Sequence, residues 1–425
     1  MTNRHKPLRE KLPAEQKRTC RRALSDETGM NLSGIYSGET EKNMLQNISA
    51  GTEDNTPGYS FGGSEEIRRM KRPGRTGENM LDRKYTDYAV EKTLELLAID
   101  SPSGYTKKAA EWVQKTFAGL GFQAEITKKG GVLIDLGGED AEDGLFLEAH
   151  TDTLGGMVAE IKGNGRLRIT ALGGMRAENA EAENVRVYKR DGFYVEGTLQ
   201  LVNASVHVNL KYGDTKRTFD TTEVVLDEDV KTREEAEALG LQVGDIVCFD
   251  PRSRVTESGY IKSRFLDDKL SVGILLGLAK YISEEKVSLK RRVYVHVTVY
   301  EEVGHGGSAS VPSGVTEAIS VDMGCVGEGL SCTEKDVSIC VKDSGGPYSY
   351  DVVTKLVEAG KKEGASYKLD VYPGYGSDVE ATLRAGFDIR HGLIGAGVYA
   401  SHGYERSHCD GVENTLKVLK GYLEI

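Results

Sequence analysis

Three apolar, strand-like segments of this chain each end in side chains that can bind a metal ion. LFLEAHTD ends in His150 and Asp152, VYVHVTVYEE ends in Glu301 and Glu302, and AISVD ends in Asp322. In open α/β sheets, ligands bind beyond the carboxyl ends of the strands. We therefore expect a sheet that brings imidazole and carboxylate groups from distant segments to one edge.

Helical segments precede, separate and follow these strands. In TDYAVEKTLELLAI, the apolar residues Val90, Leu94 and Leu97 fall on one helical face, and DDKLSVGILLGLAKYISEE has a similar pattern. Further helices are predicted at about 105–120 and 351–362, and DGVENTLKVLKGYL closes the chain. Alternation of strands and helices predicts an α/β fold, with a mostly parallel sheet flanked by helices.

The character of the sequence changes twice along the chain. Within 164–254, short strand-like segments such as LRITAL and SVHVNLKYGD alternate with turn signals, which predicts a small all-β domain. This domain is inserted into an α/β domain formed by 83–163 and 255–425. Residues 1–82 have no sustained apolar periodicity and are rich in Arg, Glu, Asn, Gly and Ser, so we predict a disordered N-terminal extension.

The composition argues against several classes of partner. The 425 residues carry a formal net charge of −11, which gives no electrostatic basis for binding nucleic acid or an anionic membrane. No apolar run approaches the roughly 20 residues that span a bilayer, and no apolar N-terminal stretch resembles a signal peptide. The six cysteines include no CxxC pair, which argues against a cysteine zinc site. We expect a cytoplasmic protein.

Each candidate ligand also has a purely structural explanation. Asp267 or Asp268 could be a helix N-cap, adjacent glutamates often lie in a solvated loop, and a lone His402 is usually a surface residue. His296 lies within a strand and is expected to be a core residue. The ordered combination HTD, DD, EE, D and H, each at a strand end or helix start or near the C-terminus, favours one shared metal site.

The motifs HTDTLGGMV, FLDDKLSVG, TVYEEVGHGG, ISVDMG and YGSDVEATLRAG resemble, in order and spacing, those of the M42 (TET-like) metallo-aminopeptidases. The resemblance covers about residues 85–425. It implies a zinc-peptidase fold and an aminopeptidase that hydrolyses N-terminal residues from short peptides with two divalent ions per chain, zinc or alternatively cobalt. The segment LGLQVGDIVCFDP resembles the end of the family's inserted β domain, which implies a homo-oligomer between a dimer and a dodecamer.

The resemblance further implies a metal-binding or catalytic role for particular residues. His150 and Asp322 would hold separate ions, Asp267 would bridge the two ions, and Glu302 would be a terminal ligand. Glu301 would be the general base, taking a proton from a metal-bridging water.

Two residues beside His150 bear on how that ligand is oriented. Asp152 would hydrogen-bond the imidazole and fix its tautomer, as carboxylates behind metal ligands do. Thr153 stands where the family often has Glu, a departure that leaves the ligands themselves intact.

The last ligand departs from the family pattern. The family usually has His followed by Ser-Pro, with a Glu four positions after the His, whereas here Glu405 follows His402 by three. Strict alignment on that Glu would put Ser401 in the ligand position. We assign His402 as the ligand, with His408 as the alternative.

Two other functions are compatible with these residues. A metal-dependent amidase or deacylase acting on non-peptide amides would use the same metal chemistry. A non-catalytic assembly protein would be expected to have lost Glu301 or the ligands, which this chain keeps. An endoglucanase needs two carboxylates that flank a sugar and no metal, so it does not account for His150.

Overall fold

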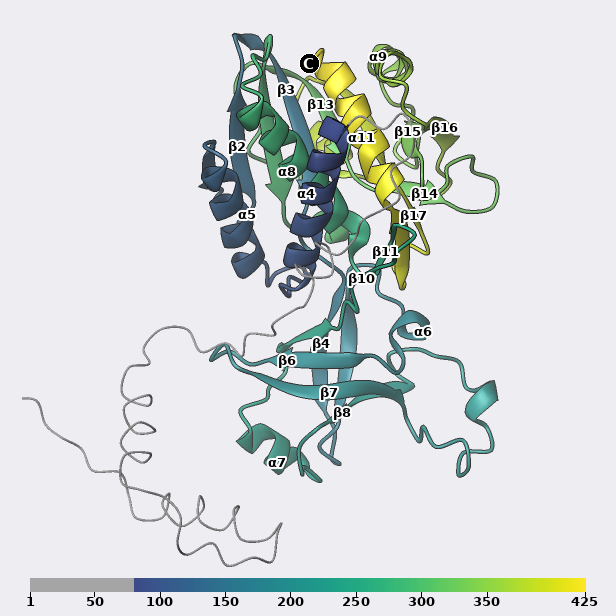
Figure 1. Ribbon diagram of the computed structural model, residues 1–425. Helices are drawn as coiled ribbons and strands as arrows, with labels where there is room; N and C mark the ends of the chain where they lie inside the picture. Colours follow the sequence, from purple (N-terminus) through teal and green to yellow (C-terminus); the bar gives the residue numbers. More distant parts are fainter. Residues whose placement is uncertain (1–79) are drawn as a thin grey trace, which may run out of the picture. The chain divides into compact units, whose positions relative to one another are not determined.

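The structure is a computed structural model that describes residues 80–425. Residues 1–79, nearly all of the predicted N-terminal extension, lie outside this part. The described residues form a large open sheet covered by helices and a separate closed barrel (Figure 1).

The sheet has 12 strands, ordered β1-β2-β12-β3-β13-β17-β18-β11-β10, with β14, β15 and β16 attached beside this path. The strands are β1 (Gln123–Ile126), β2 (Val132–Gly137), β3 (Asp140–His150), β10 (Arg254–Val255), β11 (Tyr260–Ser263), β12 (Arg291–Thr298), β13 (Val315–Val321), β14 (Gly324–Val326), β15 (Val337–Lys342), β16 (Tyr367–Val371), β17 (Arg390–Tyr399) and β18 (Glu405–His408).

The prediction of a mostly parallel sheet is wrong, because the sheet is mixed. The central strands β12, β3, β13 and β17 are parallel to one another. The pairs β1–β2, β10–β11 and β17–β18 are antiparallel. Each of these pairs is joined by a link too short to cross over the sheet, and such links can only join antiparallel strands.

The register of the central strands places their carboxyl ends at one level. Thr298 of β12 lies beside His150 of β3, and Ser320 of β13 lies beside Glu148 of β3. The residues that directly follow β12 and β13 therefore emerge next to His150, at one edge of the sheet.

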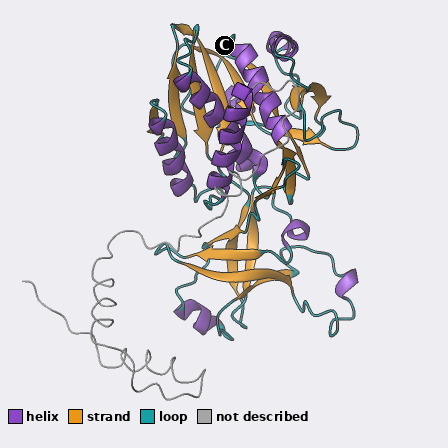
Figure 2. Ribbon diagram, viewed as in Figure 1, coloured by secondary structure: helices purple, strands orange, loops and turns teal. Residues whose placement is uncertain are grey.

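Helices pack against the sheet (Figure 2). In β3, Leu145 and Leu147 belong to one buried apolar cluster, whereas Phe146 belongs to another. Successive side chains of a strand point to opposite faces, so both faces must be shielded from water. The helices are α4 (Met80–Leu97), α5 (Lys107–Gly119), α8 (Leu266–Glu284), α9 (Tyr350–Lys362), α10 (Asp378–Arg384) and α11 (Cys409–Leu423). None of the described helices is long and apolar enough to cross a membrane.

The inserted β structure is a closed barrel with the strand order β4-β5-β8-β7-β6-β9. Its strands are β4 (Gly155–Ile161), β5 (Leu167–Leu172), β6 (Asn184–Tyr188), β7 (Tyr194–Leu201), β8 (Thr222–Leu226) and β9 (Ile246–Phe249), and its connections contain α6 (Ala177–Ala180), η1 (Tyr212–Asp214) and α7 (Arg233–Ala238). The first barrel strand lies before the expected range 164–254, because β4 follows β3 after only four residues.

Glu317 joins several elements at the sheet edge opposite the strand carboxyl ends. This fully buried carboxylate accepts hydrogen bonds from Arg291 Nη1 at 2.7 Å, Arg390 Nε at 3.2 Å and Tyr422 Oη at 2.6 Å. Burial alone would raise the pKa of Glu317, but hydrogen bonds from Tyr422 and Arg291 together with nearby positive charges hold it below its ordinary value. The carboxylate therefore links β12, β13, β17 and α11.

We predict that Glu317→Gln lowers the free energy of unfolding at pH 7 by about 1.5–3 kcal/mol, because charge-assisted hydrogen bonds are lost. The folded pKa is depressed, so this contribution is present above the unfolded pKa and is lost as pH falls through the folded value. Urea unfolding at pH 7 and at pH 3 measures both effects, with the exposed Glu358→Gln on α9 as the control. Equal stability of Glu317→Gln and the wild type at pH 7 would contradict the prediction.

Candidate metal centre

His150 ends β3, and both nitrogens of its buried ring face polar partners. Nε2 lies 3.1 Å from Asp267 Oδ1 and 3.7 Å from Glu301 Oε2. Nδ1 lies 2.9 Å from the carbonyl oxygen of Asp152 but 3.6 Å from the carboxylate of the same residue. The hydrogen bond that orients the imidazole is thus made to the main chain of Asp152 rather than to the carboxylate that we expected.

The carboxylate of Asp152 is engaged elsewhere. Its Oδ2 accepts a hydrogen bond from Ser103 Oγ at 2.5 Å, and its Oδ1 accepts one from the backbone N–H of Glu301 at 3.1 Å. Asp152 is completely buried, so these contacts replace the hydrogen bonds of water. It therefore ties the end of β3 to the residues that follow β12. No sequence motif indicated that Ser103 would donate a hydrogen bond to Asp152.

The aspartate pair lies in an irregular first turn of α8. Asp267 and Asp268 have non-helical backbone angles, and the N-cap position is occupied by Phe265. Phe265, rather than either aspartate, precedes the first residue of α8. Asp267 donates its backbone N–H to Glu405 Oε2 at 3.1 Å, and Asp268 Oδ2 accepts from the backbone N–H of His150 at 3.2 Å.

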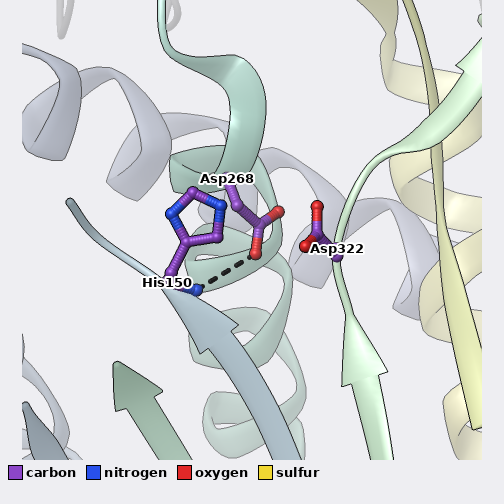
Figure 3. Close-up of side chains that lie close together, drawn as sticks. All are labelled: His150, Asp268 and Asp322. Carbon is purple, nitrogen blue, oxygen red and sulfur yellow. Dashed lines mark hydrogen bonds between the residues drawn. The ribbon is translucent and has the colours of Figure 1, made fainter. Parts of the chain in front are cut away.

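The structure forms two overlapping groups of potential metal ligands. His150, Asp268 and Asp322 make up one group, whose side chains face one another in Figure 3. His150, Asp267 and Glu302 make up the second, and in each group the ligand atoms lie within 4.8 Å of one another. His150 and Asp322, which the resemblance assigns to separate ions, thus lie in one group. The sequence did not single out Asp268 as a ligand.

A buried oxygen in this cluster has no protein partner. Asp268 Oδ1 is inaccessible to solvent and makes no hydrogen bond with the described residues. A buried polar atom left unpaired costs about 1–3 kcal/mol, or more when it is charged. Imidazole nitrogens and carboxylate oxygens are also a donor set that zinc takes. The residues present therefore fit a divalent cation.

His402 reaches the same cluster from the loop between β17 and β18. Its Nε2 lies 3.6 Å from both Asp267 Oδ2 and Glu302 Oε2. Two ligands of one zinc ion, each about 2 Å from the metal, lie roughly 3–3.5 Å apart. Glu405 accepts the backbone N–H of His402 at 3.0 Å and fixes the loop.

The alternative ligand, His408, is used elsewhere. Its Nε2 lies 2.8 Å from the carbonyl oxygen of Ser258, and its Nδ1 accepts the backbone N–H of Asp410 at the start of α11. Ser401, the position given by strict alignment, is exposed. His296 is buried, as expected of a core residue.

Burial opposes the ionisation of this carboxylate cluster. Burial, then repulsion from Asp322, raises the pKa of Asp268 well above its ordinary value. Burial is likewise the largest cause that raises the pKa of Glu301 and Glu302, and it raises the pKa of Asp322 to about 7. For Asp267, hydrogen bonds from His150 and His402 outweigh burial, and its pKa is lowered. Positive charge placed among these groups would favour their ionised forms.

The sequence also matches known peptidases. Residues 130–418 match the family model of the M42 glutamyl aminopeptidases. The chain is 41% identical over 340 residues to YhfE of Bacillus subtilis (strain 168), covering 79% of this chain and 98% of that protein. It is 26% identical over 204 residues to the lysyl aminopeptidase of Pyrococcus furiosus, covering 47% of this chain and 56% of that protein.

Solved structures share the fold. The aminopeptidase APDkam598 from the archaeon Desulfurococcus kamchatkensis superimposes with a TM-score of 0.72 at 23% identity, covering 80% of this chain and 95% of that chain. The TET1 peptidase of Pyrococcus horikoshii superimposes with a TM-score of 0.69 at 21% identity, covering 78% of this chain and 98% of that chain. That peptidase can assemble into a tetrahedron or a large octahedral shell.

We predict that His402→Ala lowers the metal content of the purified protein by about one ion per chain, because it removes an imidazole that faces Asp267 and Glu302. The matched control is His408→Asn, which keeps a side chain able to cap α11. Metal analysis by mass spectrometry, on protein shown to be folded by circular dichroism, measures the difference. Normal metal content in His402→Ala with loss in His408→Asn would reverse the assignment.

Proposed function

We propose that this chain, which belongs to the M42 glutamyl aminopeptidase family and is thus an aminopeptidase, binds two divalent ions and removes N-terminal residues from short peptides. The contacts of Asp267 support this function most directly. Its Oδ1 lies 3.1 Å from His150 Nε2, and its Oδ2 lies 3.6 Å from His402 Nε2. A carboxylate that turns one oxygen towards each of two histidines is suited to bridge two ions.

The other proposed ligands form two sets, one on each side of Asp267. We assign His150 and Asp322 to one side of Asp267, and Glu302 and His402 to the other, with Asp268 beside the first set. Zinc suits this mixture of imidazole and carboxylate groups, and cobalt is the alternative. When bound, the ions polarise the scissile carbonyl and lower the pKa of water at the site.

Glu301 is the proposed general base. It belongs to neither ligand group, and its side chain is 15% exposed, against 4% for that of Glu302. The hydrogen bond from its backbone N–H to Asp152 fixes its position beside His150. From there the carboxylate can take a proton from the attacking water and deliver it to the leaving amine, so one group serves as base and then acid.

We also propose that the protein is a homo-oligomer. The connection between β7 and β8 exposes Val206, Val208 and Leu210 at 55%, 71% and 93% of their surface. Contiguous exposed apolar side chains mark interaction surfaces in soluble proteins. The assembly of the Pyrococcus horikoshii TET1 peptidase into shells is in keeping with this.

The test of catalysis compares the two adjacent glutamates. Glu301→Gln keeps the shape of the side chain but cannot accept a proton, so we expect kcat to fall by about 10²–10⁴-fold with the metal content and KM little changed. Glu302→Gln should lose metal as well as activity. The measurements are kinetics on aminoacyl-p-nitroanilides and metal analysis.

Three results would count against these assignments. Near wild-type kcat in Glu301→Gln would remove it as the base. Metal loss in Glu301→Gln but not in Glu302→Gln would exchange the two roles. A wild-type protein that hydrolyses only N-acyl amides would be a deacylase instead.

The test of assembly uses light scattering at micromolar concentrations. We predict that Val208→Asp with Leu210→Asp reduces the molar mass, because buried charges would destabilise an apolar interface. Val243→Asp changes another exposed apolar residue of the barrel domain and should leave the mass unchanged. A monomeric wild-type protein with full activity would contradict the proposal.

A further inference from the structure

The loop that carries the two glutamates is held by a lysine from another part of the sheet. We call residues 301–308, which follow β12 with the sequence EEVGHGGS, the glutamate loop. Lys129 lies in the turn between β1 and β2. Its Nζ donates to Ser308 Oγ at 2.8 Å, to the carbonyl of Gly306 at 3.0 Å and to the carbonyl of His305. An ammonium group has three N–H donors, and this loop accepts all three.

The glutamate loop also packs against α10. Gly307 donates its N–H to Asp378 Oδ1 at 2.6 Å and accepts a hydrogen bond from Thr382 Oγ1 at 2.7 Å. A Cβ on Gly306 would lie 2.2 Å from Asp378 Oδ1, so the loop backbone sits directly on this side chain. Lys129 and α10 thus both bind the distal half of the loop, residues 305–308.

The proximal half of the loop, residues 301–304, makes fewer hydrogen bonds to other elements than the distal half does. Residues Glu301–Val303 form a single 3-10 turn, and the N–H of Glu301 is bound by Asp152. Gly304, at φ 83°, then turns the chain towards His305. Displacement of the distal half would therefore be transmitted to the glutamates through a few backbone bonds.

The charge of Lys129 has a second effect. Burial lowers the pKa of Lys129, but the nearby buried carboxyl groups of Asp378, Asp152 and Glu148 act in the opposite direction and favour its charged form. A neutral side chain of similar length would remove both the three hydrogen bonds and this compensating charge. The contacts with the loop thus need a cation with several donors.

We propose that Lys129 is a positioning residue for peptide hydrolysis, whose ammonium holds the glutamate loop so that Glu301 stays in place beside His150. This inference rests on the proposed function of Glu301 as general base. Lys129 acts through the loop and does not itself bind the reacting groups. Such placement matters because a displacement of about 1 Å at a catalytic group can cost about 10²-fold in rate.

The main test replaces Lys129 by Met in the full chain. Lys129→Met should lower kcat by about 10- to 100-fold at saturating metal, with KM nearly unchanged. Lys129→Arg, which keeps the charge and several donors, should restore part of that loss. Lys128→Met changes the neighbouring exposed lysine and should behave as the wild type.

A second readout does not depend on activity. Amide hydrogen exchange of the glutamate loop in metal-free protein should be faster in Lys129→Met than in the wild type or Lys128→Met. Ser308→Ala removes one of the three contacts and should lower kcat by about three- to tenfold. If Lys129→Met fails to fold, kcat and loop hydrogen exchange are measured in Ser308→Ala and Lys129→Arg instead, and these values test the role of Lys129.

The possible failures can be told apart. Wild-type kcat and loop exchange in Lys129→Met, with Glu301→Gln inactive, would overturn the role of Lys129 alone. If Lys129→Met does not fold, wild-type values in Ser308→Ala would overturn that role. A fully active Glu301→Gln would instead overturn the proposed function, and the role of Lys129 with it.

Discussion

The structure must compensate the negative charge of a cluster of largely buried carboxylates. Asp268, Glu301, Glu302 and Asp322 meet at one sheet edge, and burial raises the pKa of each of them. Such a cluster is costly unless positive charge is placed within it. Two divalent ions would supply that charge. They would also supply the Lewis acidity that peptide hydrolysis requires, so under the proposed function the same carboxylates would serve both folding and catalysis.

Buried carboxylates that are not proposed as ligands orient the main chain around this cluster. Asp152 accepts the N–H of Glu301, and Asp378 accepts the N–H of Gly307. Glu405 accepts the N–H groups of both Asp267 and His402, and burial raises its pKa to about 8. The loops that bear the site are thus fixed through their backbones, which would leave the side chains of the proposed ligands free to face bound ions.

The parts of the fold that depend on local pattern could be predicted from the sequence. A helix was expected at 351–362 and is found as α9, because amphipathic periodicity is a local property. The antiparallel flanks of the sheet were missed, although the short links within β1–β2, β10–β11 and β17–β18 are local features that indicate antiparallel pairing. Spacing alone could not decide between His402 and His408. In the folded chain His402 faces Asp267, whereas His408 faces the carbonyl oxygen of Ser258. Lys129 lies in an ordinary turn, and only the folded chain shows its three contacts.

The proposed function depends on two divalent ions held at this site. Calorimetric titration of zinc into chelator-treated, full-length protein, with aminoacyl-p-nitroanilide hydrolysis followed at each addition, tests it most directly. We predict that the metal-free protein is inactive, that about two ions bind per chain, and that activity returns as they bind. A metal-free protein that hydrolyses these substrates at the full rate, or a chain that binds no zinc, would rule out the proposed two-ion site.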